Sequence, residues 1–249
     1  MSARAHLAAL LAFAIPFSAQ AGSGPEIEKR TVVSRGKKRV YYLFIPGAVT
    51  PEKKAPLLVT IHGSTADGRS LVERWKDLAA AKGIVLAGPD ATDLSRWASP
   101  QDGPLLLKDV VEDVAAKHAI DGRRVYLFGQ SAGAVFALQM ACLESEYFAA
   151  AAIHAGAVSS DYFSIFDFAT RKIPIAIYIG TRDQFFPLDV VRATSEALKA
   201  RDFPLLYREM PNHAHNYGEV SGRINEEIWA YFAANPLPAD PKYTNYRDP

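Results

Sequence analysis

The sequence predicts an α/β fold: a single domain with a mostly parallel central sheet and helices on both of its faces. Short apolar runs alternate along the chain with longer segments of helical period, which is the pattern of consecutive β-α-β units. The apolar runs from residue 57 onward are mostly continuous, as expected for parallel strands that are covered on both faces. The composition, with 49% hydrophobic residues among 249, is that of a globular chain with one large core.

Seven strands and five helices follow from this pattern. The predicted strands are residues 39–45, 57–61, 84–87, 124–128, 150–154, 173–179 and 205–210. The predicted helices lie near residues 70–82, 104–119, 132–144, 187–201 and 222–234. The apolar stripe of the helix at 104–119 reaches His118, which we expect to be a packed or helix-terminal side chain. The segment 155–172 is too short to hold a large lid domain.

The two ends of the chain are expected to lie outside the folded domain. Residues 1–21 combine Arg4, an apolar run of 11 residues and the small-residue pattern that ends at Ala21. This layout predicts a signal peptide cleaved after Ala21, and the run is shorter than the roughly 20 residues that span a bilayer. We therefore expect a secreted or periplasmic protein without stable membrane insertion after cleavage. Residues 22–235 form the predicted domain, and residues 236–249 form a Pro-rich, extended and partly loose tail.

Charge and cysteine content narrow the classes of partner and of site. The net charge is +1 and no basic stripe stands out, which argues against nucleic acid as the main partner. The single cysteine, Cys142, lies in an apolar helical segment, so no intramolecular disulfide can form and a buried, inert thiol is expected. A neutral small molecule is the partner that this composition favours.

A candidate nucleophile stands between a predicted strand and a predicted helix. Residues 129–133 read Gly-Gln-Ser-Ala-Gly, directly after the strand at 124–128. Glycines at the two outer positions allow the tight turn that exposes a serine hydroxyl, here that of Ser131. The N–H of Ala132, at the start of the helix, would face an oxyanion that forms beside this hydroxyl. The arrangement is typical of nucleophilic serine catalysis.

A serine nucleophile needs a base and an orienting carboxylate, and both follow in the chain. Asp183 lies on the loop after the strand at 173–179, at the edge of the sheet where catalytic groups gather. Two histidines, His213 and His215, follow the last strand, and either could serve as the base. A His-x-His pair can also ligate a metal, but no third ligand cluster is evident, so we expect no metal site.

Further candidates surround this set. The strand at 57–61 runs into His62-Gly63-Ser64, so the N–H of Ser64 is expected to be the second oxyanion donor and His62 to be structural. Three candidate substrate-binding residues are Trp97, Gln130 and Phe185. For Trp97 a packing role is equally compatible with the sequence. The aromatic residues of segment 155–172 could form a substrate rim, but core packing of a short helix is the favoured interpretation.

These motifs together resemble a known superfamily. The motifs are His62-Gly63, Gly-Pro-Asp at 88–90, Arg96-Trp97, Ile120-Asp121, residues 129–133, residues 180–183 with Pro187, and the terminal histidine. Over about residues 38–234 the chain resembles the α/β-hydrolases, and within them the secreted esterases grouped with polyhydroxybutyrate depolymerases and feruloyl esterases. The resemblance implies a serine hydrolase that cleaves small-molecule or polymeric esters through an acyl-enzyme, without a cofactor.

The resemblance also bears on the base and on the alternatives. In several such esterases a small polar residue and an aromatic follow the catalytic histidine, which favours His215 here. The cysteine that many relatives carry near Gly63 is absent, so their disulfides are not expected here. Asn212-His213 stands where Gly-His is common, so His213 stays open as the alternative base. A serine peptidase or acyltransferase on the same fold is a second hypothesis, and a binding protein without turnover is a third. The complete Ser, Asp and His set disfavours the third.

Overall fold

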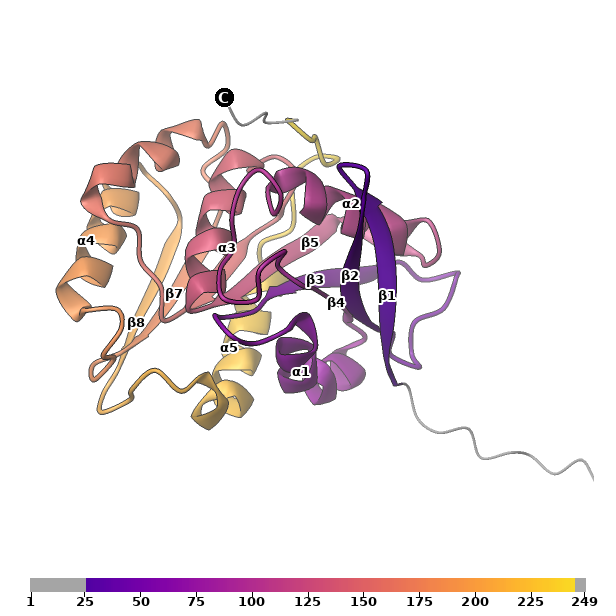
Figure 1. Ribbon diagram of the computed structural model, residues 1–249, viewed down its shortest axis with the longest axis horizontal. Helices are drawn as coiled ribbons and strands as arrows, with labels where there is room; N and C mark the ends of the chain where they lie inside the picture. Colours follow the sequence, from indigo (N-terminus) through magenta and orange to yellow (C-terminus); the bar gives the residue numbers. More distant parts are fainter. Residues whose placement is uncertain (1–25, 245–249) are drawn as a thin grey trace, which may run out of the picture.

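The computed structural model describes residues 26–244, which form one sheet flanked by helices (Figure 1). The predicted signal peptide at 1–21 and the last five residues of the predicted tail lie outside the described residues. The strands are β1 (Ile27–Ser34), β2 (Lys37–Phe44), β3 (Ala55–Ile61), β4 (Val85–Pro89), β5 (Ile120–Gln130), β6 (Ala151–His154), β7 (Ile175–Gly180) and β8 (Leu205–Met210). The helices are α1 (Gly68–Lys82), α2 (Pro104–Ala115), α3 (Ala132–Leu143), α4 (Leu188–Lys199) and α5 (Ser221–Ala233), with short 3₁₀ helices η1 (Ser160–Phe168) and η2 (Tyr217–Glu219).

The eight strands form one mixed sheet in the order β1-β2-β4-β3-β5-β6-β7-β8. From β4 to β8 all neighbours pair in parallel, whereas β1 pairs antiparallel with β2 and β2 antiparallel with β4. The mostly parallel sheet predicted from the continuous apolar runs is confirmed. Helices connect the parallel strands, so the carboxyl ends of β3, β5, β6, β7 and β8 meet at one edge of the sheet.

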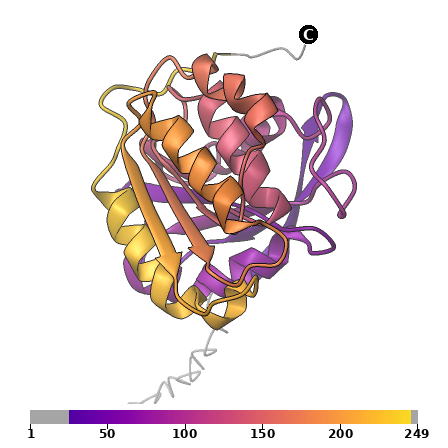
Figure 2. The same ribbon diagram turned by 90° about the vertical axis from the view of Figure 1, so that its left-hand side faces the viewer.

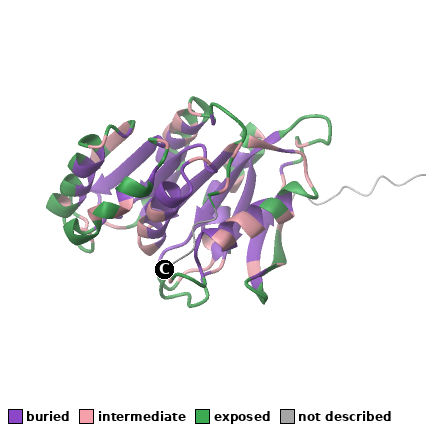
Figure 3. Ribbon diagram, turned by 90° about the horizontal axis from the view of Figure 1, so that it is seen from above, coloured by how far each residue is buried: buried purple, intermediate pink, exposed green. Residues whose placement is uncertain are grey.

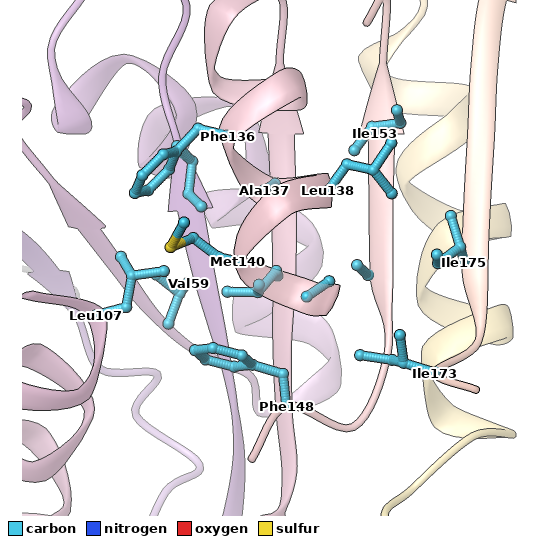
Figure 4. Close-up of a cluster of buried hydrophobic side chains, with 14 of the residues drawn as sticks. Val59, Leu107, Phe136, Ala137, Leu138, Met140, Phe148, Ile153, Ile173 and Ile175 are labelled. Carbon is cyan, nitrogen blue, oxygen red and sulfur yellow. The ribbon is translucent and has the colours of Figure 1, made fainter. Parts of the chain in front are cut away.

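Helices cover both faces of the sheet, as predicted (Figures 1 and 2). One hydrophobic cluster joins α2, α3 and α4 to one face, and a second joins α1 and α5 to the other. Successive residues of β3 alternate between them: Leu57 and Val59 belong to the first cluster and Leu58 to the second. Figure 4 shows the first cluster around α3, where Phe136 and Met140 lie beside Val59. Burial is greatest in the sheet, and exposed residues lie mainly on the outer helix faces and loops (Figure 3).

Strand β1 is absent from the sequence prediction. Its residues are largely exposed and include Glu28, Lys29 and Arg30. Because β1 lies at the edge of the sheet, its side chains are not packed between helices and need not be apolar. Charged side chains on an edge strand also discourage pairing with other chains. The missing strand adds an antiparallel edge to the sheet and leaves the parallel part unchanged.

The end of α2 and the end of the chain differ in detail from the expectations. Helix α2 ends at Ala115, and His118 is half-buried in the turn that follows, where its N–H donates to the carbonyl of Val114 at 3.0 Å. Residues 236–244 of the predicted tail form no helix or strand and are mostly exposed, but Leu237 is buried and its N–H donates to the Arg123 carbonyl at 2.8 Å. Segment 155–172 forms η1 and holds no inserted lid domain. Within residues 26–244, no helix is both long enough and apolar enough for a bilayer crossing.

A buried carboxylate fixes the long segment between β4 and α2. Asp102 is fully buried and accepts from the Arg39 guanidinium of β2 at 2.7 Å, from the Thr92 N–H at 2.9 Å and from the Ala98 N–H at 2.9 Å. The same segment carries Trp97, which lies beside the loop after β3. The ion pair therefore holds this segment against the sheet near the strands' carboxyl ends.

We expect Asp102→Ala to lower the free energy of unfolding by about 3–5 kcal/mol, because it leaves the buried Arg39 charge without its partner. The matched control is Glu196→Ala, which removes a carboxylate that is 71% exposed and pairs with Lys199 at 2.8 Å. That change should cost less than about 1 kcal/mol. Urea unfolding followed by circular dichroism measures both. Equal losses in the two variants would show that Asp102 is not the anchor of this segment.

Candidate active site

Ser131 occupies a strained turn between β5 and α3. Its backbone has φ 57° and ψ −122°, a conformation that residues other than glycine rarely adopt. The Ser131 N–H donates to the His154 carbonyl at 3.0 Å. The turn requires glycine on both sides. A Cβ at Gly129 would lie 2.2 Å from the Gly133 carbonyl oxygen, and a Cβ at Gly133 would lie 2.1 Å from the Ile61 carbonyl oxygen. The close approach between β3, β5 and α3 thus presents the Ser131 hydroxyl at the sheet edge.

The structure brings Ser131, His215 and Asp183 into one hydrogen-bonded chain. The His215 Nε2 lies 2.9 Å from the Ser131 Oγ, and its Nδ1 lies 2.7 Å from Asp183 Oδ2. With Nδ1–H donating to the carboxylate, Nε2 is free to accept the serine proton. Of the two candidate histidines, His215 lies between serine and carboxylate, and His213 does not.

Asp183 is fixed and kept ionised by its loop. Its side chain is 1% exposed, and Oδ1 accepts from the N–H groups of Phe185 and Phe186, each at 2.9 Å. Burial alone would raise the pKa of this carboxyl. The two N–H groups and the His215 imidazole outweigh burial and lower the pKa below its usual range. The rings of Phe185 and Phe186 lie on His215 with centroids 4.7 and 6.0 Å away.

The loop after β3 lies against the serine turn. Two backbone donors are available there: the Ala132 N–H at the first position of α3, where helices leave donors free, and the Ser64 N–H, which forms no hydrogen bond to another residue in 26–244. His62 is fully buried, and burial lowers its pKa, so the ring is neutral. Its Nδ1–H donates to the Gly63 carbonyl at 2.8 Å, and its Nε2 accepts from the Ala91 N–H at 3.1 Å. This histidine shapes the loop, as predicted.

The three candidate substrate-binding residues have different surroundings. A cleft of about 430 Å³ lies beside His215, and Gln130 and Phe185 line it together with Arg74, Gln184 and Gly218. Phe185 is 66% exposed there. Trp97 is not among the residues that line this cleft. Its ring stacks on Phe136 at 4.7 Å and its Nε1–H donates to the His62 carbonyl at 2.9 Å, so it packs behind the loop after β3.

A pair of buried histidines lies behind the site, and the sequence prediction gives it no role. His154, at the end of β6, is fully buried, and its Nε2 lies 3.1 Å from Nε2 of His213. Burial, with repulsion from His213 and His215, lowers the pKa of His154 to about 3. The Nδ1 of His213 lies 3.8 Å from Glu219, so a proton on Nδ1 leaves Nε2 to accept from His154. The pair thereby ties the loop that carries His215 to the sheet.

Sequence periodicity marks His154 only as the end of an apolar strand, and Arg74 only as a surface cation of a helix. Their places beside the site depend on which strand ends and helix faces converge, which local sequence does not encode. Among residues 26–244, no group of three or more His, Cys, Asp or Glu side chains is arranged to hold a metal ion.

Known proteins share this fold and parts of this sequence. Residues 101–175, which include the serine turn, match the family model described as Esterase PHB depolymerase. NocK, a candidate esterase of Nocardia uniformis subsp. tsuyamanensis, is 29% identical over 197 residues, which are 73% of this chain and 54% of NocK. Poly(3-hydroxyalkanoate) depolymerase C of Paucimonas lemoignei is 31% identical over 115 residues, which are 41% of this chain and 28% of the depolymerase. The chain thus spans about half the length of NocK and less than a third of the length of the depolymerase.

A solved structure extends the likeness to nearly the whole fold. The ferulic acid esterase of Anaeromyces mucronatus superposes with a TM-score of 0.65 at 17% identity, covering 86% of this chain and 93% of that one. At this identity the likeness concerns the fold, which is that of the α/β-hydrolases. The fold and the resemblance inferred from the sequence motifs are confirmed.

The low pKa of His154 makes stability depend on pH. The unfolded chain takes up a proton at this residue as the pH falls below about 6.5, while the folded chain does not until about pH 3. Above pH 6.5 the neutral His154 costs the folded state nothing. As the pH falls from 6.5 towards 3, the free energy of unfolding falls by about 1.4 kcal/mol per pH unit. Between pH 6.5 and pH 5, the free energy of unfolding should therefore fall by about 2 kcal/mol less in His154→Gln than in the wild type. Urea unfolding at the two pH values measures this difference.

Identical slopes in the wild type and in His154→Gln would contradict the assignment of a neutral, buried His154.

Proposed function

We propose that this chain, an α/β-hydrolase of the esterase type matched by the PHB depolymerase family model, is a secreted or periplasmic serine hydrolase that cleaves carboxylic esters. The observation that carries the proposal is the chain of contacts from Ser131 through His215 to Asp183, with distances of 2.9 and 2.7 Å. Ser131, Asp183 and His215 follow one another along the chain in the order that belongs to this fold. The layout of residues 1–21 supports export.

In the first half-reaction, the Ser131 oxygen attacks the ester carbonyl and its proton passes to the His215 Nε2. The carbonyl π electrons move to oxygen, and a tetrahedral oxyanion forms. The oxyanion then collapses, the bond to the alcohol oxygen breaks, and the imidazolium donates its proton to the leaving alcohol. Asp183 holds the imidazole in the required tautomer and stabilises its positive charge. An acyl group is left on Ser131.

In the second half-reaction, water takes the place of the alcohol. The His215 Nε2 removes a proton from water as the hydroxyl adds to the acyl carbon, and the same proton returns to the Ser131 oxygen when the acid leaves. The cleft beside His215 is open to solvent and no lid domain covers it within residues 26–244. Water therefore has access to the acyl-enzyme, which favours hydrolysis over transfer to an alcohol.

The N–H groups of Ala132 and Ser64 are the proposed oxyanion donors. Both are backbone groups without another acceptor in the described part of the chain, so they are free to bind a developing negative charge. The strain at Ser131 and the packing behind Gly63 fix these donors before substrate arrives. Preorganisation of this kind avoids a reorganisation cost in the transition state.

The open cleft, with exposed Phe185 at its edge, suits a small ester or the exposed part of a polymeric ester. Gln130 also lines this cleft, and its Nε2 lies 3.4 Å from the His215 Nε2. This amide is placed to contact the substrate group nearest to the base.

Ser131→Ala should lower the turnover of short-chain 4-nitrophenyl esters by at least about 10⁴-fold without lowering the melting temperature, because only the nucleophilic oxygen is lost. Ser159→Ala is the matched control: Ser159 is exposed and its side chain caps no helix. It should hydrolyse the esters at the wild-type rate. Release of 4-nitrophenolate measures both, and undiminished turnover in Ser131→Ala would defeat the assignment.

A further inference from the structure

An unpaired cation lines the cleft beside the proposed nucleophile. Arg74, on α1, shares this cleft with Gln130 and His215. A Cβ at Gly218 would lie 3.0 Å from an Arg74 guanidinium nitrogen and 3.1 Å from its Cζ, so the guanidinium lies against the segment that follows His215. A side chain from α1, remote in sequence from the turn at Ser131, thus lies close to His215.

The charge of Arg74 has no partner in the described part of the protein. Within residues 26–244, its guanidinium forms neither an ion pair nor a hydrogen bond. On the same helix Arg69 pairs with Glu73 at 3.0 Å, and Lys76 lies 3.7 Å from Glu73. Glu73 therefore pairs with its other neighbours, and within residues 26–244 no ion pair joins Arg74 to Asp77, the second carboxylate of α1.

The rest of the cleft does not neutralise this charge. No Asp or Glu is among the residues that line it, and Arg74 is the one lining residue with a permanent charge. The nearby Asn216 amide is already engaged, because its oxygen accepts from the Gly218 N–H and its nitrogen donates to Glu219. The cleft thus presents a planar array of donors and a positive potential to whatever enters it.

We infer that the substrate is an ester that carries a free carboxylate, which pairs with Arg74 while the ester carbonyl lies at Ser131. A guanidinium matches a carboxylate with two parallel N–H donors, and such a pair fixes orientation as well as adding affinity. This inference rests on the proposed function and narrows its substrate class. The carboxylate can belong to the acyl part or to the alcohol part of the ester, and both sources share this chemistry.

Two pairs of chromogenic esters distinguish the sources. Mono-4-nitrophenyl glutarate and 4-nitrophenyl pentanoate differ by a carboxylate on the acyl side. The butyrates of 5-carboxy-2-nitrophenol and 2-nitrophenol differ by a carboxylate on the leaving group. For each pair, the ratio of kcat/KM values is compared between the wild type and Arg74→Gln, so the intrinsic reactivity of each ester cancels.

In one of the two pairs, Arg74→Gln should lower the ratio of charged to neutral ester by roughly 5- to 30-fold, as expected for a solvent-accessible charge-assisted hydrogen bond. Arg74→Lys keeps the charge without the planar fork and should retain part of the preference. The matched control Arg69→Gln removes a cation of the same helix that does not line the cleft, and should leave both ratios unchanged. Added salt at 0.5 M should weaken the wild-type preference.

Failure of this inference differs from failure of the proposed function. Equal ratios in wild type and Arg74→Gln for both ester pairs would overturn the role of Arg74 while Ser131-dependent hydrolysis continues. Absence of hydrolysis of all four esters by the folded wild type, or hydrolysis that survives Ser131→Ala, would overturn the proposed function and the inference that rests on it. Circular dichroism melting of each variant verifies that it is folded.

Discussion

The turn at Ser131 is the constraint on which the rest of the structure depends. A non-glycine residue at positive φ is unfavourable by itself, and here it is held by contacts that leave no alternative. The carbonyl of His154 binds the Ser131 N–H, and Gly129 and Gly133 let β5, α3 and β3 approach more closely than any side chain would allow. The parallel sheet supplies these neighbours, because adjacent strands end at the same edge.

The site also separates charges by burial. His62 and His154 are buried and neutral, because desolvation lowers the pKa of each, whereas Asp183 keeps its charge through hydrogen bonds. Two different tasks follow from this separation. The neutral histidines tie loops to the sheet, and the ionised carboxylate orients the one histidine that reaches Ser131. Arg74 stands apart, since it contributes a charge to the cleft and none to the packing of the site.

Much of this arrangement could be predicted from the sequence, because strongly periodic segments and a constrained turn leave local signals. The parallel strands, the five helices and the positions of Ser131 and Asp183 belong to this class. Strand β1 was missed because an exposed edge strand carries charges where a buried strand carries apolar residues. The choice between His213 and His215, and the presence of Arg74 in the cleft, depend on long-range packing of loops and helices that no local pattern specifies.

The role of Ser131 is tested most directly by covalent labelling of the purified protein with a serine-reactive phosphonate, followed by mass spectrometry of its peptides. A phosphonate leaves a stable tetrahedral adduct on an activated serine oxygen, so labelling reports nucleophile, base and oxyanion donors together. One adduct per chain is expected, on the peptide that contains Ser131. A folded protein that takes up no label, or that carries it on another residue, would contradict the assignment of Ser131 as the activated nucleophile.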